Sequence, residues 1–176
     1  MLIDSRKFDI RVWVLMTHDL RVYFYREGYV RTSSEIYSTN PSKITDLSVH
    51  LTNNAIQKNL KNYGKFEEGN QLSFRYLENC IVKMGGDFDK VLESMKKIVK
   101  IASLSVKKKI NRGGRKFCFE VFGYDFMIDC NFKVWLIEVN TNPCLEESSL
   151  ILENLLPRML DDTFKLTIDQ IFEGSS

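Results

Sequence analysis

The stretch FCFEVFGYDFMIDCNFKVWLIEVNTNPCLE, residues 117–146, decides the fold. Its two apolar, aromatic-rich runs flank a short polar break at residues 130–133, which is typical of a β-hairpin with a four-residue loop. If residues 130–133 form this loop, Asp129 pairs with Val134, and counting outward places Asp125 directly opposite Glu138. The sequence therefore predicts two carboxylates side by side on one face of a sheet.

These paired carboxylates form the first candidate site. Residues that face each other across antiparallel strands have Cβ atoms ~4.5–5.5 Å apart, and like charges there are destabilising. Asn140 shares the face of Glu138, because side chains alternate along a strand. Asp125, Glu138 and Asn140 then form an all-oxygen cluster that a hard cation such as Mg²⁺ could bind together with substrate phosphates. The alternative interpretation is acidic side chains on a solvated sheet face.

The composition predicts a single domain over residues 1–176, with its own core, because 44% of the residues are hydrophobic. A net charge of +2 gives no general reason to expect nucleic acid or a membrane as partner. The four cysteines show no C-x-x-C pair, so reduced thiols are favoured over a zinc site. With no signal-peptide pattern at the start and no apolar run of ~20 residues, we expect a cytoplasmic protein.

The remaining elements follow from hydrophobic periodicity. Residues 8–16 and 21–25 predict a second hairpin, and residues 88–110 predict a helix with one apolar stripe. Towards the C-terminus we expect a helix that begins after residues 146–149, is interrupted at Pro157 and is followed by another over residues 159–172. This order predicts an α+β fold in which helices flank a mostly antiparallel sheet.

Charged residues also alternate along the first predicted strand. Asp9 and Arg11 share one face with Trp13, Lys7 precedes them, and Arg31 lies in the following extended segment. Guanidinium groups grip phosphate or carboxylate groups in a bidentate manner, so these cations could form an anion site. Solvated surface charge is the alternative interpretation for each of them.

Six motifs occur in order along the chain: KFDIR at 7–11, YREGYVR at 25–31, HLTN at 50–53, IQK at 56–58, YGKFEEGN at 63–70, and GYDFMID followed by WLIEVN within 123–140. With these motifs the chain resembles the C-terminal catalytic portion of the tubulin–tyrosine ligase family. Members of this family are ATP-grasp enzymes that join an amino acid to tubulin through an amide bond. The resemblance implies the C-terminal part of an ATP-grasp fold, with the upstream part of that fold missing from this chain.

The resemblance also implies roles for individual residues. It implies Mg²⁺ ligands at Asp125, Glu138 and Asn140, the three residues that the hairpin register brings together, with Asp125 also at the nucleotide. The implied ATP contacts are Lys7, Asp9, Thr52 and Asn53. Arg11 and Arg31 are implied to face the amino-acid carboxylate and the acceptor tail.

For the whole reaction, the resemblance implies that ATP converts a carboxylate into an acyl phosphate, which an amine then attacks. The expected partners are a free amino acid, tyrosine or glutamate, and tubulin or its acidic C-terminal tail. We accordingly expect a cytoplasmic, cytoskeleton-associated protein at microtubules and in cilia.

Two other hypotheses stay open. One is a truncated fragment or an inactive module that keeps the fold and grips acidic tubulin tails with its basic segment, which contains Lys107, Lys108, Lys109, Arg112, Arg115 and Lys116. The other is an ATP-grasp ligase that acts on another protein or on a small metabolite, because a fold does not determine a substrate.

Overall fold

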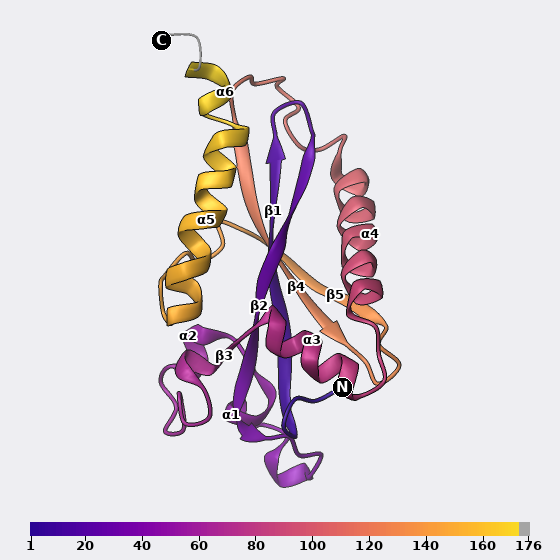
Figure 1. Ribbon diagram of the computed structural model, residues 1–176, viewed down its shortest axis with the longest axis vertical. Helices are drawn as coiled ribbons and strands as arrows, with labels where there is room; N and C mark the ends of the chain where they lie inside the picture. Colours follow the sequence, from indigo (N-terminus) through magenta and orange to yellow (C-terminus); the bar gives the residue numbers. More distant parts are fainter. Residues whose placement is uncertain (173–176) are drawn as a thin grey trace.

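The structure, a computed structural model, describes residues 1–172 and contains one five-stranded sheet in the order β3-β2-β1-β4-β5. All neighbouring strands are antiparallel: β1 Arg6–Thr17, β2 Val22–Ile36, β3 Gln71–Ser73, β4 Phe119–Ile128 and β5 Val134–Thr141. The longer helices are α3 Phe74–Lys83, α4 Phe88–Val106 and α5 Leu150–Leu166. The short ones are η1 Pro41–Lys43, α1 Leu47–His50, α2 Asn54–Gln57, η2 Glu68–Asn70 and α6 Asp169–Phe172. The predicted α+β fold is confirmed (Figure 1).

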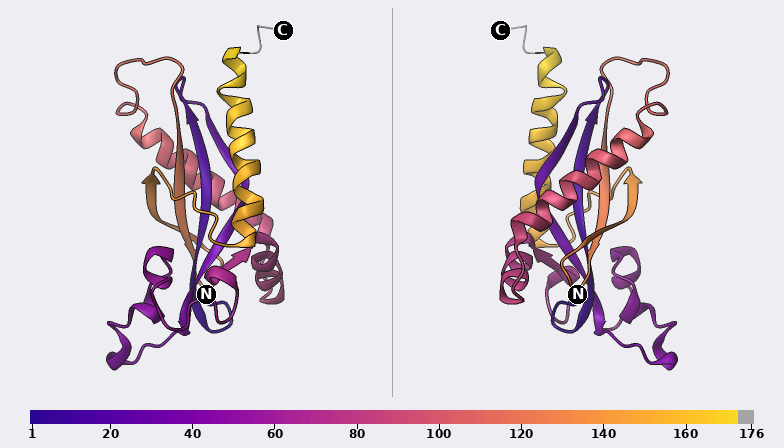
Figure 2. Two further views of the ribbon diagram at one scale, coloured as in Figure 1. Left: turned by 90° about the vertical axis from the view of Figure 1, so that its left-hand side faces the viewer. Right: turned by 90° about the vertical axis from the view of Figure 1, so that its right-hand side faces the viewer.

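Helices cover both faces of the sheet, and Figure 2 shows α4 and α5 on opposite sides of β1 and β2. Side chains of β1 alternate between the two layers, as a strand requires. Val12 and its neighbours on that face pack in the larger core with α3 and α4, whereas Trp13 packs with Leu156 and Met159 of α5. The face towards α5 also carries the charged residues of β1, so α5 and the candidate site share one side of the sheet.

The predicted helix over residues 88–110 is confirmed as α4, although it ends at Val106. Asp87 caps its start by accepting a hydrogen bond from the backbone N–H of Lys90. Val91, Met95 and Val99 of the predicted stripe are buried against the sheet. None of the helices within residues 1–172 is both long and apolar enough to cross a bilayer.

The predicted break at Pro157 is wrong. α5 runs without interruption from Leu150 to Leu166, with Pro157 inside it. Pro157 lies on the exposed side of the helix, between buried Leu156 and Met159. The carbonyl group one turn earlier loses its N–H partner but can be hydrated by water there, and the buried stripe on the other side holds the helix together.

The central hairpin contains the predicted pair Asp125–Glu138, but the pairing beside its loop differs from the prediction. Val134 pairs with Ile128 rather than Asp129. A bulge between the pairs Phe126–Leu136 and Asp125–Glu138 inserts one additional residue, Ile137, into β5. Because of this additional residue, Glu138 lies opposite Asp125, as it would if Asp129 paired with Val134 and the strands continued without a bulge. The prediction missed both the longer loop and the bulge. Each shifts the register by one residue, and the two shifts cancel at Asp125 and Glu138.

The second predicted hairpin is confirmed as β1 and β2, and β2 is longer than expected because it continues through Arg31 to Ile36. Its register shifts between the pairs Val14–Phe24 and Val12–Gly28, so β2 bulges in between. The short strand β3 is not predicted from the sequence, where residues 63–70 form a loop and the following residues show no alternation. It pairs only with the part of β2 around Val30.

Gly28 lies where the backbone of β1 and the ring of Phe74 approach β2 closely. A Cβ at this position would lie 2.6 Å from Phe74 Cζ and would also overlap the carbonyl oxygen of Arg11. We expect Gly28→Ala to lower the free energy of unfolding by about 1–3 kcal/mol through overpacking, measured by denaturant unfolding. Gly113→Ala is the matched control, because a Cβ there has no neighbour within 4 Å. Equal stability of both variants would contradict the close approach.

Candidate functional site

Four charged side chains from three strands form one network on the α5 side of the sheet. The strand registers place Asp9 opposite Arg31 and Arg11 opposite Asp125. Arg31 donates to both oxygens of Asp9, at 2.7 Å each, and to Asp125 Oδ2 at 2.8 Å. Arg11 binds Asp125 through Nε, and through Nη2 at 3.0 Å. Asp125 thus lies between two guanidinium groups.

All four side chains of this network are buried, so water contributes little to their stabilisation. Burial alone would raise the pKa of Asp125, but hydrogen bonds and charge from Arg11 and Arg31 hold that pKa below its ordinary value. Burial alone would lower the pKa of Arg31, yet the neighbouring Asp9 and Asp125 raise it. Two cations and two anions compensate each other. The interpretation of Arg11 and Arg31 as solvated surface charge is therefore wrong.

Each arginine nevertheless keeps one nitrogen, Nη1, whose N–H groups can donate to another partner. The bonds to Asp9 and Asp125 use the Nε and Nη2 atoms of both guanidinium groups. Within residues 1–172, no acceptor binds Nη1 of Arg11 or of Arg31. Both side chains line a pocket of about 360 Å³. An anionic group in this pocket would therefore meet positioned N–H donors.

We call this space the arginine pocket. Its lining comes from β1, β2, α2, β3, β5 and the segment after β5, and includes Arg11, Tyr29, Arg31, Asn53, Lys58, Gln71, Glu138, Asn140, Glu146 and Ser148. Tyr29, Lys58, Gln71, Glu146 and Ser148 are not among the residues singled out from the sequence. Burial raises the pKa of Tyr29, so its phenol stays protonated at neutral pH and can donate to a ligand. The turn of the chain after Pro143 brings in Glu146 and Ser148, whereas Tyr29, Lys58 and Gln71 come from β2, the end of α2 and β3, and only the fold places these residues around one pocket.

Glu138 and Asn140 extend the buried network to the pocket rim. The Asn140 amide donates to Glu138 Oε1 at 3.1 Å and lies 3.4 Å from Asp125 Oδ2. Glu138 is exposed, so the interpretation of a solvated acidic face fits this residue but not the buried Asp125. The three predicted metal ligands are therefore brought together, with an N–H₂ group between the two carboxylates.

This donor set fits Mg²⁺ with two adjustments, a turn of the Asn140 amide and the sharing of one Asp125 oxygen, because both oxygens of Asp125 accept from guanidinium groups. No group of three or more His, Cys, Asp or Glu side chains gathers within residues 1–172 in a way that could hold a metal. Two carboxylates and one amide oxygen are instead the kind of partial set to which Mg²⁺ adds water and substrate phosphates. The nitrogen and oxygen of an amide are assigned from hydrogen bonds, and turning the Asn140 amide would aim its oxygen between the carboxylates.

The predicted nucleotide contacts divide into two groups. Thr52 joins the buried network by donating to Asp9 Oδ2 at 2.8 Å, and Asn53 is exposed at the pocket wall, directly before α2. Lys7 instead donates to the backbone carbonyl of His50 at 2.6 Å and does not line the arginine pocket. Two residues of β1 therefore hold the segment 50–53 against the sheet: Lys7 binds its first residue, His50, and Asp9 binds Thr52.

Gln57 is completely buried and holds the segment 50–53 in place through hydrogen bonds. Its Oε1 accepts from the backbone N–H of Ser34 at 3.1 Å and from Asn70 at 3.2 Å. Its Nε2 donates to the carbonyl of Leu51, the residue before Thr52. The glutamine of the IQK motif thus links the 50–53 segment to β2, which explains why a polar side chain is completely buried there.

Comparison with known proteins agrees with these features. The model of the family described as "Tubulin-tyrosine ligase family" matches residues 1–175. The chain is 40% identical to "Tubulin glycylase 3D" of Tetrahymena thermophila, covering 96% of this chain and 17% of the relative. It is 36% identical to "Tubulin glycylase 3A" of Drosophila melanogaster, covering 97% and 17%, and 36% identical to "Probable tubulin polyglutamylase TTLL9" of Bos taurus, covering 94% and 36%. It thus spans only a minor part of each relative's length. The chain belongs to the tubulin-tyrosine ligase family.

Proposed function

We propose that this chain supplies part of an ATP-dependent ligase of the ATP-grasp type, which forms an amide bond between an amino acid and tubulin. The observation that carries the proposal is the arginine pocket, where Nη1 of Arg11 and of Arg31 have no acceptor within residues 1–172 and lie beside the oxygens of Glu138 and Asn140. Family membership and the printed names of the relatives support tubulin as the acceptor.

The arginines suit the chemistry of such a ligase. A substrate carboxylate attacks the terminal phosphorus of ATP and ADP leaves; an amine then attacks the acyl phosphate and inorganic phosphate leaves. Both steps concentrate negative charge on phosphoryl and carboxyl oxygens. Because Asp9 and Asp125 hold Arg11 and Arg31 in place before substrate binds, little reorganisation is needed when this charge develops. No covalent protein nucleophile is required.

Asp125, Glu138 and Asn140 are the residues that would hold Mg²⁺, which supplies charge neutralisation to bound phosphates. Thr52 and Asn53 would contact the nucleotide at the pocket wall, with Asp9 orienting Thr52. Lys7 is a contact for the nucleotide only if it leaves the His50 carbonyl, since this bond holds its ammonium group outside the pocket. Arg11 and Arg31 would hold the amino-acid carboxylate and the acceptor tail.

Glycine is the amino acid that the relatives favour. Tubulin glycylases 3D, 3C, 3B and 3A are 33–40% identical to this chain over nearly its whole length. Two relatives at 32% and 36% identity are named as probable polyglutamylases, so glutamate is the second candidate. Tyrosine, the amino acid of the family name, is the third candidate.

Incorporation of labelled amino acids tests this assignment. The chain is incubated with Mg·ATP, tubulin and labelled glycine, glutamate or tyrosine in turn, and label bound to tubulin is counted. We expect ATP-dependent incorporation of glycine alone. Incorporation of glutamate or tyrosine would retain the ligase and overturn glycine as its substrate. If no amino acid is transferred, even when the chain is joined to the upstream part of an ATP-grasp fold, the proposal that it supplies part of a ligase is wrong.

Microtubules are the place where such a ligase would meet its acceptor, including those of cilia, within the cytoplasm. A sedimentation assay with taxol-stabilised microtubules would detect the association directly. Binding to the acidic tubulin tail is expected to weaken with salt, because screening shortens the range of surface electrostatics to about 8 Å at 0.15 M.

A second candidate function, an inactive tail-binding module, is favoured by the basic segment after α4. The chain has no acidic residue between Glu93 and Glu120, whereas Lys107, Lys108 and Lys109 are all exposed. Tubulin binding in the sedimentation assay without amino-acid transfer would favour this candidate.

A further inference from the structure

The outer edge of β2 near the hairpin tip has no neighbouring strand within residues 1–172. β3 pairs with β2 only from Tyr29 to Arg31, so the stretch at residues 22–25 is bordered by β1 alone. No turn or loop within the described chain donates to, or accepts from, the backbone of these residues. The edge therefore presents peptide groups to which another strand can bind. In Figure 1 this part of β2 lies between α5 and α4.

A pocket of about 430 Å³ borders this edge on the α4 side of the sheet. We call it the α4 pocket, and it is lined by Met16, Val22, Phe24, Val99, Lys100 and Lys107, among others. Its floor is apolar and its wall is cationic. No carboxylate within residues 1–172 forms an ion pair with Lys100 or Lys107. An inserted side chain that carries a carboxylate would compensate this charge.

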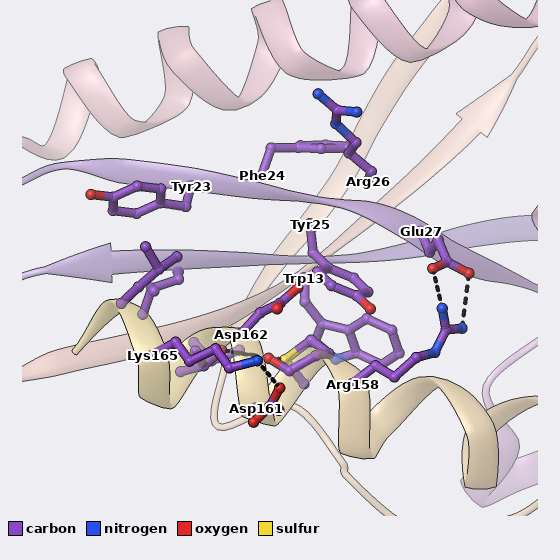
Figure 3. Close-up of a pocket in the computed structure, with 15 residues that line it drawn as sticks. Trp13, Tyr23, Phe24, Tyr25, Arg26, Glu27, Arg158, Asp161, Asp162 and Lys165 are labelled. Atoms are coloured by element: carbon purple, nitrogen blue, oxygen red, sulfur yellow. Dashed lines mark hydrogen bonds and ion pairs between the residues drawn. The ribbon is translucent and has the colours of Figure 1, made fainter. Parts of the chain in front are cut away.

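A larger pocket of about 700 Å³ borders the same edge on the α5 side (Figure 3). We call it the α5 pocket, and it is lined by Trp13, Tyr23, Tyr25, Val121, Met159 and Leu166, among others. Four of the charged groups at its rim are paired, Arg158 with Glu27 and Lys165 with Asp161, whereas Arg26 and Asp162 form no ion pair within residues 1–172. The indole N–H of buried Trp13 has no acceptor within residues 1–172. The lining is mostly aromatic and aliphatic, so this pocket suits an aromatic or other apolar side chain.

We propose that the edge of β2 at residues 22–25 is a docking site for an extended, acidic polypeptide segment, which adds to the sheet as a further strand. Successive side chains of a strand point to opposite faces. Alternate side chains of the partner would therefore enter the α4 pocket and the α5 pocket. The two pockets demand carboxylates on one side and aromatic or other apolar side chains on the other, and this alternation gives the site its specificity.

The geometry favours a polypeptide over other anionic partners. A membrane or a nucleic acid could satisfy the lysines, but neither offers N–H and C=O groups at the spacing of a strand edge. The bulge in β2 between Phe24 and Gly28 limits the free edge to a short stretch. A second copy of this chain would bring Lys100 and Lys107 towards each other at a two-fold axis, and like charges disfavour that pairing.

Fluorescence anisotropy with a short labelled peptide in which glutamate alternates with tyrosine tests the site. We expect the peptide to bind, and Lys100→Glu with Lys107→Glu to weaken binding at least about tenfold. The matched control is Lys108→Glu with Lys109→Glu, which makes the same change of charge at the same helix end outside the pocket. Equal weakening in both double variants would overturn docking in the α4 pocket, as would failure of the peptide to bind.

Two further readouts test strand addition itself. Hydrogen–deuterium exchange at residues 22–25 should slow when the peptide binds, and the same peptide N-methylated at alternate residues should lose its affinity. Unchanged exchange, or full affinity of the methylated peptide, would overturn the proposal. So would dimerisation of the free chain through β2, or binding to phosphatidylserine vesicles without binding to the peptide. The variants should keep any Mg·ATP binding, since the edge and the arginine pocket share no residue.

Discussion

Replacing Asp125 with asparagine is expected to lower the free energy of unfolding by about 3–5 kcal/mol, because it leaves buried guanidinium charge without its partner. Arg11 and Arg31 both bind this carboxylate, whose side chain is only 2% exposed. The amide keeps the shape of the side chain, so the loss reports charge and hydrogen bonding rather than a cavity. Denaturant unfolding of both proteins at neutral pH measures the difference.

The matched control is Asp161→Asn. Asp161 also forms an ion pair, with Lys165 at 2.6 Å, but both side chains are more than 60% exposed. Exposed pairs contribute about 0–1 kcal/mol. If the two variants lose the same stability, Asp125 does not compensate buried arginine charge, and the proposed preorganisation of Arg11 and Arg31 is wrong.

Replacing Glu138 with glutamine is expected to remove most of the response to Mg·ATP while leaving the fold intact. The residue is exposed and forms no ion pair within residues 1–172, so we expect a change in stability within about 0.5 kcal/mol. Ligand at about 100 times its Kd stabilises a protein by ~2.7 kcal/mol. Wild-type chain should therefore show a higher Tm in Mg·ATP, and the variant should show little or no rise at the same concentration.

Glu147→Gln controls for the loss of one negative charge, because Glu147 is exposed but does not line the arginine pocket. It should keep the full rise in Tm. ATP with EDTA should give the wild-type chain a smaller rise than Mg·ATP. A full response of Glu138→Gln would remove Glu138 from the proposed metal ligands, whereas no response of the wild-type chain would contradict nucleotide binding itself.

The sequence predicted those parts of the fold that depend on local patterns. The stripe of Val91, Met95 and Val99 identified α4, and alternation in β1 placed Asp9 and Arg11 on one face. Pro157 misled the prediction, because the cost of proline in a helix depends on whether the freed carbonyl can reach water. β3 escaped prediction because three residues cannot show a period, and only their pairing with β2 defines them.

The candidate site was predictable as a set of residues but not as a network. Hairpin counting brought Asp125 next to Glu138, since these residues are close along the chain. The partners of Arg11 could not be counted in this way, because Asp125 lies 114 positions away and only the pairing of β1 with β4 brings it near. The ion pairs of Arg11 and Arg31 with Asp125 depend on that long-range register, whereas the pair Asp9–Arg31 lies within the β1–β2 hairpin.

The bulge at Ile137 divides the central hairpin into two halves whose alternation is set independently. Between the loop and the bulge, the side chains of Val134 and Leu136 point to the core. Beyond the bulge, the side chains of Glu138 and Asn140 point to the charged face of the sheet. Uninterrupted alternation with Ile137 kept in the ladder would place Ile137 on the charged face and turn Glu138 towards the core, whereas deleting Ile137 would remove the bulge and leave Glu138 opposite Asp125. The bulge at Ile137 thus allows Leu136 to pack in the core and Glu138 to reach the charged face, although the two residues are two positions apart in one strand.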